Sequence, residues 1–114
     1  MEPRGCMAIP APAGGEITFY SATQVPHILK VMIAATTGIP ESKIRVIAPA
    51  VGGGFGGKIN VDPDAILSVT LANHLGVPVR WTETRTEAAG STHQGRGQIQ
   101  HMDCLLYTSP SPRD

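Results

Sequence analysis

The sequence has few of the features that mark several large protein classes. Its two cysteines, Cys6 and Cys104, lie near opposite ends and form no CxxC pair, so we expect a reduced, cytoplasmic chain without disulfides. Nine basic residues balance nine acidic ones, which argues against binding nucleic acid or a membrane surface through net charge. No apolar run reaches the roughly 18 residues of a membrane span. The start, MEPRGCMAIP, has no apolar signal core, so secretion is not expected.

Histidine is present but does not follow the spacing of a metal site. None of the four forms a ligand-spaced cluster with Cys6 or with the carboxylates, so each is expected on the surface or in a loop: His27, His74, His93 and His101. The length of 114 residues suits one modest domain or a piece of a larger one. A chain of this size can still bury a hydrophobic core.

Three segments have the composition and patterning of β-strands. They are residues 16–21 (EITFYS), in which apolar and polar side chains alternate, residues 43–48 (KIRVIA) and residues 79–82 (VRWT). Residues 1–15 are rich in proline, alanine and glycine, and we expect them to form an extended entry or a loop.

Two helices are predicted between these strands. Thr23 is the expected cap of the first helix and Gly38 its end, while Asp62 and Gly76 bound the second. The second helix carries one stripe of leucines at four-residue spacing, of the kind that faces the core of a globular protein: Leu67, Leu71 and Leu75. The resulting β-α-β-α-β rhythm predicts an α+β fold with mixed α/β layers.

Residues 51–58, VGGGFGGK, concentrate five glycines around one phenylalanine. Glycine loses the most conformational freedom on folding, so such a cluster calls for a tight turn or for close approach of the backbone to a ligand. A bulged turn that binds nothing would explain one or two of these glycines. The spacing also fits G-x-G-x-x-G and most of a phosphate-binding P-loop. A nucleotide-binding or phosphate-binding module using Gly52–Lys58 is therefore an alternative.

The context of the cluster argues against that alternative. Ile59 replaces the Ser or Thr of a P-loop, and the next helix is expected only near Asp62, which removes the helix N-terminus from the loop. No acidic residue follows at the position where a dinucleotide ribose would need one. A third alternative is a non-catalytic α/β interaction domain, in which Gln24 and Phe55 would lie far apart.

An ordered set of segments resembles one known family, the molybdenum hydroxylases, which include xanthine dehydrogenase, aldehyde oxidase and aerobic carbon monoxide dehydrogenase. The segments are MEPRG, ITFYSATQVPH, GIPESKIRVI, GGGFGGK, GVPVRWTETRTE and HQGRGQ, and the match they mark extends over nearly all of residues 1–102. The resemblance is to the molybdopterin-binding subunit. It implies that residues 1–103 are part of a molybdopterin-binding domain.

The resemblance implies an oxidoreductase that hydroxylates aldehydes or N-heterocycles, or oxidises carbon monoxide, with oxygen derived from water. The cofactor would be a molybdenum–pterin group, either molybdopterin itself or its cytosine dinucleotide. Iron–sulfur clusters and FAD would belong to other subunits or domains of an oligomeric complex. The family's general-base glutamate lies outside this chain, so no catalytic residue is expected here and the chain alone is predicted to be inactive.

Five residues match the family's cofactor contacts: Gln24, Gly53, Gly54, Phe55 and Gly56. In the family, the glutamine amide hydrogen-bonds an oxo ligand of molybdenum, a task suited to an uncharged donor. The loop passes beside the metal, where residues without Cβ let backbone N–H groups approach. Protein side chains mostly do not ligate the metal directly in this family, so no metal ligand is expected.

One position departs from part of the family and bears on the substrate. Purine-oxidising members carry a glutamate directly after the loop lysine, where this chain has Ile59. An apolar side chain cannot make that hydrogen bond, which weakens xanthine as a substrate. Further along, Arg85 and Glu87 are interpreted as a structural ion pair, and Arg96 as a structural contact.

The last segment differs from everything before it. Residues 104–114, CLLYTSPSPRD, lack apolar periodicity and end in alternating serine and proline. They resemble one reading frame of a transposase-type sequencing adapter. We therefore expect this segment to be non-native and exclude it from the predicted domain.

Overall fold

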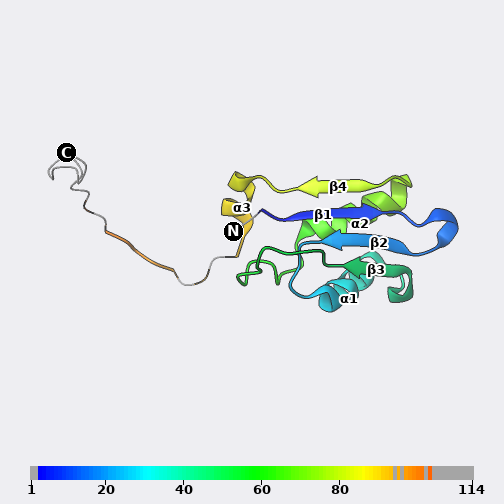
Figure 1. Cartoon of the computed structure of the whole chain (residues 1–114), viewed down its shortest axis with the longest axis horizontal. Helices are drawn as coiled ribbons and strands as arrows, with labels where there is room; N and C mark the ends of the chain where they lie inside the picture. Colours follow the sequence, from blue (N-terminus) through cyan, green and yellow to red (C-terminus); the bar gives the residue numbers. More distant parts are fainter. Residues whose placement is uncertain (1–2, 94, 96, 102, 104–114) are drawn as a thin grey trace.

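The computed structural model describes residues 3–93, 95, 97–101 and 103. Its centre is a mixed sheet with the strand order β3-β2-β1-β4, formed by β1 (Gly5–Ile9), β2 (Ile17–Ser21), β3 (Ile44–Ile47) and β4 (Val79–Thr82) (Figure 1). Strand β1 pairs antiparallel with β2 and β4, whereas β2 and β3 are parallel. Short 3-10 turns at Pro12–Gly14 and Glu41–Lys43 complete the connections.

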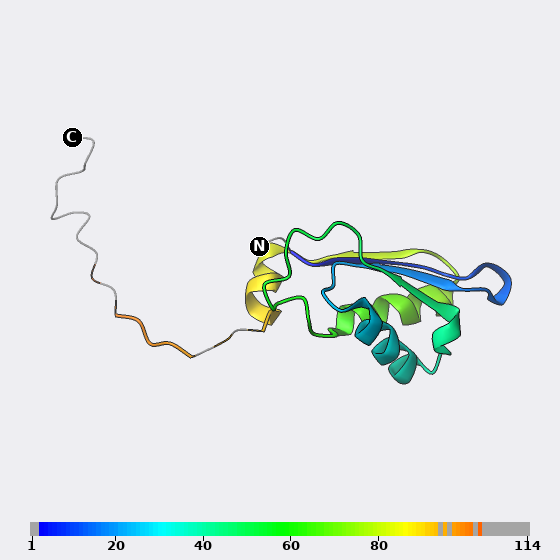
Figure 2. The same cartoon turned by 60° about the horizontal axis from the view of Figure 1, so that its bottom comes forward.

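Two helices cover the same face of the sheet, as Figure 2 shows. Helix α1 (Pro26–Thr37) packs on β3, and α2 (Pro63–Leu75) packs on β1 and β4. The core lies between the helices and the sheet and is formed by Cys6, Ala8, Ile17, Phe19, Leu29, Ile33, Ile44, Ala65, Val69 and Ala72. The predicted α+β class is thereby confirmed. No helix in the described residues is long and apolar enough to cross a bilayer.

The predicted helix ends are close to those observed. Gly38 and Gly76 both adopt the left-handed conformation that ends a helix without a Cβ clash. Asp62 is the N-cap residue of α2, as expected, but its side chain does not cap the helix. The N-cap residue of α1 is Val25, not Thr23. The Thr23 hydroxyl instead accepts a hydrogen bond from the N–H of Val25, two residues further along the chain, at 3.2 Å.

Residues 1–15 were expected to form an extended entry or a loop. Residues Gly5–Ile9 are extended, but they form β1, an inner strand of the sheet, which the sequence did not indicate. Its core-facing residues are Cys6 and Ala8, which are 7% and 0% exposed. Both side chains are small, and neither belongs to the β-branched or aromatic types that mark a strand in a sequence. The strand is specified by its two neighbours, which pair with it from both sides.

The leucine stripe of α2 does not face the core. Leu67, Leu71 and Leu75 are 58%, 45% and 59% exposed. The buried face consists of smaller residues, Ala65, Ser68, Val69 and Ala72. Small side chains let the helix approach the small residues of β1 closely, and the Cys6 Sγ lies 3.3 Å from the Ser68 Oγ. Side-chain size at the helix–sheet contact therefore decides which face of α2 is buried.

A third helix, α3 (Arg85–Ser91), was not predicted. It begins with a capping box in which the Glu87 N–H donates to the Thr84 hydroxyl at 3.2 Å and the Thr84 N–H donates to the Glu87 carboxylate at 2.8 Å. Glu87 thus caps its own helix, while its ion pair with Arg85 stays a prediction. The predicted contact of Arg96 and the predicted non-native segment 104–114 lie outside the described residues.

Candidate functional site

The parallel pairing of β2 and β3 creates the site. Because parallel neighbours end at the same edge of a sheet, whatever follows β2 lies beside whatever follows β3. Gln24 comes three residues after β2, and the glycine loop 51–58 follows β3 after a short connection. Segments about 30 residues apart in the chain therefore meet at one end of the sheet.

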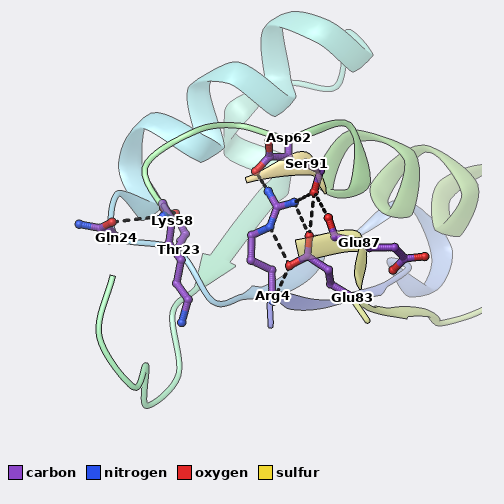
Figure 3. Close-up of polar contacts among 8 residues, drawn as sticks. All are labelled: Arg4, Thr23, Gln24, Lys58, Asp62, Glu83, Glu87 and Ser91. Carbon is purple, nitrogen blue, oxygen red and sulfur yellow. Dashed lines mark hydrogen bonds and ion pairs between the residues drawn. The ribbon is translucent and has the colours of Figure 1, made fainter. Parts of the chain in front are cut away.

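Gln24 is held against the end of the glycine loop by hydrogen bonds to the main chain of Lys58 (Figure 3). The Gln24 N–H donates to the Lys58 carbonyl at 3.0 Å, and the Lys58 N–H donates to the Gln24 Oε1 at 3.3 Å. The Thr23 hydroxyl donates to the same carbonyl at 3.4 Å. With Oε1 engaged by the loop, the amide nitrogen of Gln24 points away from Lys58.

Gly54 provides the space that the Gln24 side chain occupies. A Cβ at position 54 would lie 2.0 Å from the Gln24 Cδ and 2.5 Å from its Oε1, far inside van der Waals contact. Gly54 is not in the left-handed region, so its backbone would accept other residues. Position 54 must lack a side chain because the Gln24 carboxamide occupies the space that a Cβ would fill.

Phe55, Gly53 and Gly56 have positive φ angles, which turn the loop. Phe55 has φ 54°, in a region that non-glycine residues rarely adopt, and Gly53 and Gly56 have φ 100° and 74°. The Phe55 ring lies against Gly53, where a Cβ would come within 2.5 Å of it, and Phe55 is 75% exposed. Gln24 and the loop thus form one continuous exposed surface, contrary to the separation that a non-catalytic interaction domain predicted.

The loop presents main-chain donors on this surface. The Gly57 N–H donates to the Gly54 carbonyl at 3.1 Å, and the Lys58 N–H is used by Gln24. The N–H groups of Gly54, Phe55 and Gly56 have no hydrogen-bond partner among the described residues. Together with the outward Gln24 amide, they offer uncharged donors to a ligand that carries acceptor oxygens.

A buried ion-pair network supports the site from the side, and sequence reasoning missed its central residue, Arg4. The Arg4 guanidinium contacts both Glu83 oxygens, at 2.7 Å and 3.3 Å, and also pairs with Asp62. Ser91 donates to Glu83 at 3.1 Å. The network joins the start of β1, the end of β4, α3 and the residue that begins α2 (Figure 3). The MEPRG segment that resembles the family's entry contains Arg4 and was the available signal.

Charge pairing shifts the pKa values in this network. The hydrogen bond from Arg4 holds the pKa of the Glu83 carboxyl below its ordinary value, although burial alone would raise it. The same bond raises the pKa of Arg4. Burial raises the pKa of Asp64 and of the Cys6 thiol. Cys6 is therefore a core thiol held in its neutral form.

A cavity of about 320 Å³ lies between the end of the glycine loop and α3. Lys58 is only 2% exposed and is one of the residues that line the cavity. The other charged or titratable residues around the cavity are Arg4, Glu83, Arg85 and His93. Within the described part of the chain, no group of three or more His, Cys, Asp or Glu residues has the arrangement to hold a metal ion.

The geometry does not suit a nucleotide phosphate on the loop. Helix α2 begins only at Pro63, so residues 52–57 do not lead directly into a helix N-terminus, and the Gly57 N–H is used within the loop. The loop instead ends against Gln24, which neither a P-loop nor a dinucleotide fingerprint requires. The nucleotide-binding alternative finds no support here or in the relatives described next.

Comparison with known proteins identifies related chains. The family model for the molybdopterin cofactor-binding domain matches residues 1–105. The carbon monoxide dehydrogenase large chain of Hydrogenophaga pseudoflava is 37% identical over 110 residues, covering 96% of this chain and 13% of that protein. The nicotine 6-hydroxylase large subunit of Paenarthrobacter nicotinovorans is 36% identical, covering 89% of this chain and 13% of that subunit.

Solved structures agree with these matches. The crystal structure of quinoline 2-oxidoreductase from Pseudomonas putida 86 superposes with a TM-score of 0.74 at 41% identity and covers 76% of this chain and 11% of that one. Reconstituted CO dehydrogenase from Oligotropha carboxidovorans gives a TM-score of 0.76 at 38% identity, over 80% of this chain and 11% of that one. This chain thus spans little more than a tenth of the length of its relatives.

Proposed function

The chain belongs to the molybdopterin cofactor-binding domain family, and from this premise we propose that it is part of the molybdenum-cofactor-binding subunit of an oxidoreductase of the molybdenum hydroxylase type. One observation carries the proposal at the level of residues. The Gln24 carboxamide is fixed beside the glycine loop with its amide nitrogen directed outward, next to unpaired loop N–H groups. This donor set fits a group whose exposed atoms are oxygens bound to a metal.

Five residues would hold the molybdenum–pterin group: Gln24, Gly53, Gly54, Phe55 and Gly56. When bound, the group would supply the oxidation chemistry, in which the family uses oxygen derived from water. The protein's part is to donate hydrogen bonds from fixed positions. Because these donors are neutral and already oriented, they stabilise negative charge on oxygen without having to reorganise during the reaction.

The whole protein's activity extends beyond these residues. We propose that the complete complex oxidises small molecules such as aldehydes, N-heterocycles or carbon monoxide, and that it passes electrons to iron–sulfur and flavin modules on other subunits or domains. The relatives' names cover these classes, including an aldehyde oxidoreductase subunit and a complex subunit gamma. We place the complex in the cytoplasm. The chain alone is proposed to be inactive, because the general-base glutamate that the family resemblance implies is expected outside it.

Ile59 narrows the range of substrates that we propose. It is 48% exposed immediately after the loop and offers no hydrogen-bonding group. A purine would lose the carboxylate contact that purine-oxidising members of the family make at this position. The proposal therefore favours substrates that need no such contact, although xanthine dehydrogenase subunits are among the relatives, at 40% and 39% identity.

Metal analysis of the intact complex that contains this segment tests the proposal. We expect molybdenum and pterin in the purified complex, and we expect Gln24→Ala to keep both while lowering kcat by about a hundredfold, as removal of one fixed donor does in other enzymes. Asn73→Ala is the matched control, because it also removes an exposed carboxamide. Asn73 lies on α2, about 15 Å along the helix from its start at Pro63, and is not one of the five proposed cofactor contacts. A wild-type complex without molybdenum would contradict the proposed function.

A further inference from the structure

The two ends of a carboxamide have opposite hydrogen-bonding character, so the orientation of Gln24 decides what it can contact. Its oxygen accepts and its nitrogen donates. If the side chain turned over, the outward surface would present an acceptor, which would repel an oxygen of the bound group. A mechanism that fixes the orientation is therefore part of the site, and it must come from neighbours that can tell oxygen from nitrogen.

The Lys58 N–H makes this distinction. A main-chain N–H can only donate, so it pairs with Oε1 at 3.3 Å and cannot pair with the amide nitrogen. Lys58 must itself be held in place for this selection to work. Its carbonyl receives two hydrogen bonds, from the Gln24 N–H at 3.0 Å and from the Thr23 hydroxyl at 3.4 Å. The main chain of Lys58 is thus fixed on both sides of its Cα.

The direction of the Thr23 hydroxyl is also determined. Its oxygen accepts from the Val25 N–H at 3.2 Å, so its single hydrogen is directed to the Lys58 carbonyl. Thr23 is 7% exposed and does not reach the outer surface that Gln24 and the loop present. It connects Val25, the N-cap residue of α1, with the end of the glycine loop.

We propose that Thr23 is a positioning residue, which holds the main chain of Lys58 so that the Gln24 carboxamide keeps its nitrogen outward. This inference rests on the proposed function, in which that nitrogen donates to the molybdenum group. It adds a residue that touches neither the cofactor nor the substrate. It also gives the last residue of the glycine cluster a role through its backbone, independent of its side-chain charge.

Two substitutions separate the hydroxyl from the shape of the side chain. Thr23→Val keeps the branched shape and removes the hydroxyl, while Thr23→Ser keeps the hydroxyl and removes a methyl group. Hydrogen exchange measured by mass spectrometry on the purified complex reports how firmly the main chain around Lys58 is held. We expect exchange at residues 56–60 to become about three- to tenfold faster in Thr23→Val, the effect of losing one neutral hydrogen bond, and to stay within about twofold of wild type in Thr23→Ser.

A spectroscopic measurement reports the orientation of the amide. In the molybdenum-loaded complex, loss of a donor to the oxo group should raise the metal–oxygen stretching frequency seen by resonance Raman in Thr23→Val, with kcat lowered and KM little changed. Thr23→Ser should restore the frequency and kcat. Gln24→Glu is the second variant, because a carboxylate still accepts from the Lys58 N–H but cannot donate outward; it should raise the frequency without faster exchange at residues 56–60.

The outcomes are distinguishable. Wild-type exchange and wild-type frequency in Thr23→Val would overturn the inference, and so would a Thr23→Ser variant that behaves like Thr23→Val, because the methyl group would then be responsible. Faster exchange throughout β1 in Thr23→Val would indicate that this variant loosens the whole fold. The Gln24→Glu variant then decides the orientation of the amide, and a wild-type stretching frequency in it would overturn the inference. If the wild-type complex contained no molybdenum, the proposed function would fail, while the exchange measurements would still decide whether Thr23 holds Lys58.

Discussion

Gly54→Ala is the substitution that most sharply separates the site from the fold. A Cβ at this position would come within 2.0 Å of the Gln24 Cδ, so the carboxamide must leave. Gln24 is an exposed, flexible side chain and can move into solvent. The hydrogen bond to Lys58 would be lost, at a cost of about 0.5–1.5 kcal/mol. Replacing glycine also lowers the entropy of the unfolded chain, which offsets about 0.4–1 kcal/mol where no backbone strain arises.

Gly54→Ala should therefore change the free energy of unfolding by about 1 kcal/mol or less, while lowering the turnover of the complex by about a hundredfold through loss of a fixed donor. Gly76→Ala, at the end of α2 and outside the proposed cofactor contacts, is the matched control. A Cβ there meets nothing within 4 Å, but φ is 68°, so left-handed strain of about 1–2 kcal/mol is expected. The control should lose at least as much stability and displace Gln24 less.

Urea unfolding of the chain and steady-state kinetics of the complex measure the two quantities, and a crystal structure of each variant locates the Gln24 side chain. Equal activity of the two variants, with Gln24 in its wild-type position in Gly54→Ala, would refute the reasoning. The comparison is informative because the expected order of stability is the reverse of the expected order of activity. No general effect of replacing a glycine with alanine produces that reversal.

Three further predictions concern the fold around the site. Arg4→Ala should destabilise the chain by about 3–5 kcal/mol in urea unfolding, because it leaves the buried Glu83 carboxylate, 1% exposed, without its guanidinium partner; a loss below about 1 kcal/mol would mean that water replaces the pair. The pKa of Glu83 is lowered from 4.5 in the folded state, so its stabilisation is complete above that value and is lost as pH falls through the lowered pKa. The free energy of unfolding should accordingly fall less between pH 7 and pH 3 in Glu83→Gln than in wild type. Asp64, whose pKa is raised, contributes with the opposite sign in both proteins, so its contribution cancels in this comparison. An equal fall in the two proteins would contradict the assignment. Leu29→Ala, at a site 2% exposed, should cost about 2–5 kcal/mol, whereas Leu71→Ala, at a site 45% exposed, should cost about 0.5 kcal/mol or less, and similar values for the two would show that the leucine stripe of α2 is covered in solution.

The elements that a sequence can predict are those whose local signals agree with their surroundings. Helix α2 was placed correctly because Pro63 at its start and Gly76 at its end act through backbone geometry, which needs no tertiary contact. The orientation of the same helix was not predictable from its leucines. Which face is buried depends on how closely α2 approaches Cys6 and Ala8, and that distance is a property of the assembled layers.

Strand β1 is an element that the sequence did not indicate, because it depends on tertiary contacts. Its core positions are filled by small residues, so it lacks the branched and aromatic side chains that indicate a strand. Its place in the sheet depends on pairing with β2 and β4, which are separated from it by different distances along the chain. Arg4 was missed for a related reason, since its partners Asp62 and Glu83 come from segments that only the folded sheet brings together.

The candidate site could be located from its glycines, but its chemistry depends on an orientation that no residue type encodes. Glycines indicate that a backbone comes close to something, and Gly54 does so because the Gln24 side chain fills the space of its missing Cβ. Whether that side chain offers an oxygen or a nitrogen to a ligand is decided by the Lys58 N–H, a group present in almost every residue of every protein. A site built from main-chain groups is therefore specified by the parallel pairing of β2 and β3, which fixes where those groups meet. Substitutions that preserve this pairing and the hydroxyl of Thr23 should leave the orientation intact, even where they alter the side chain of Lys58.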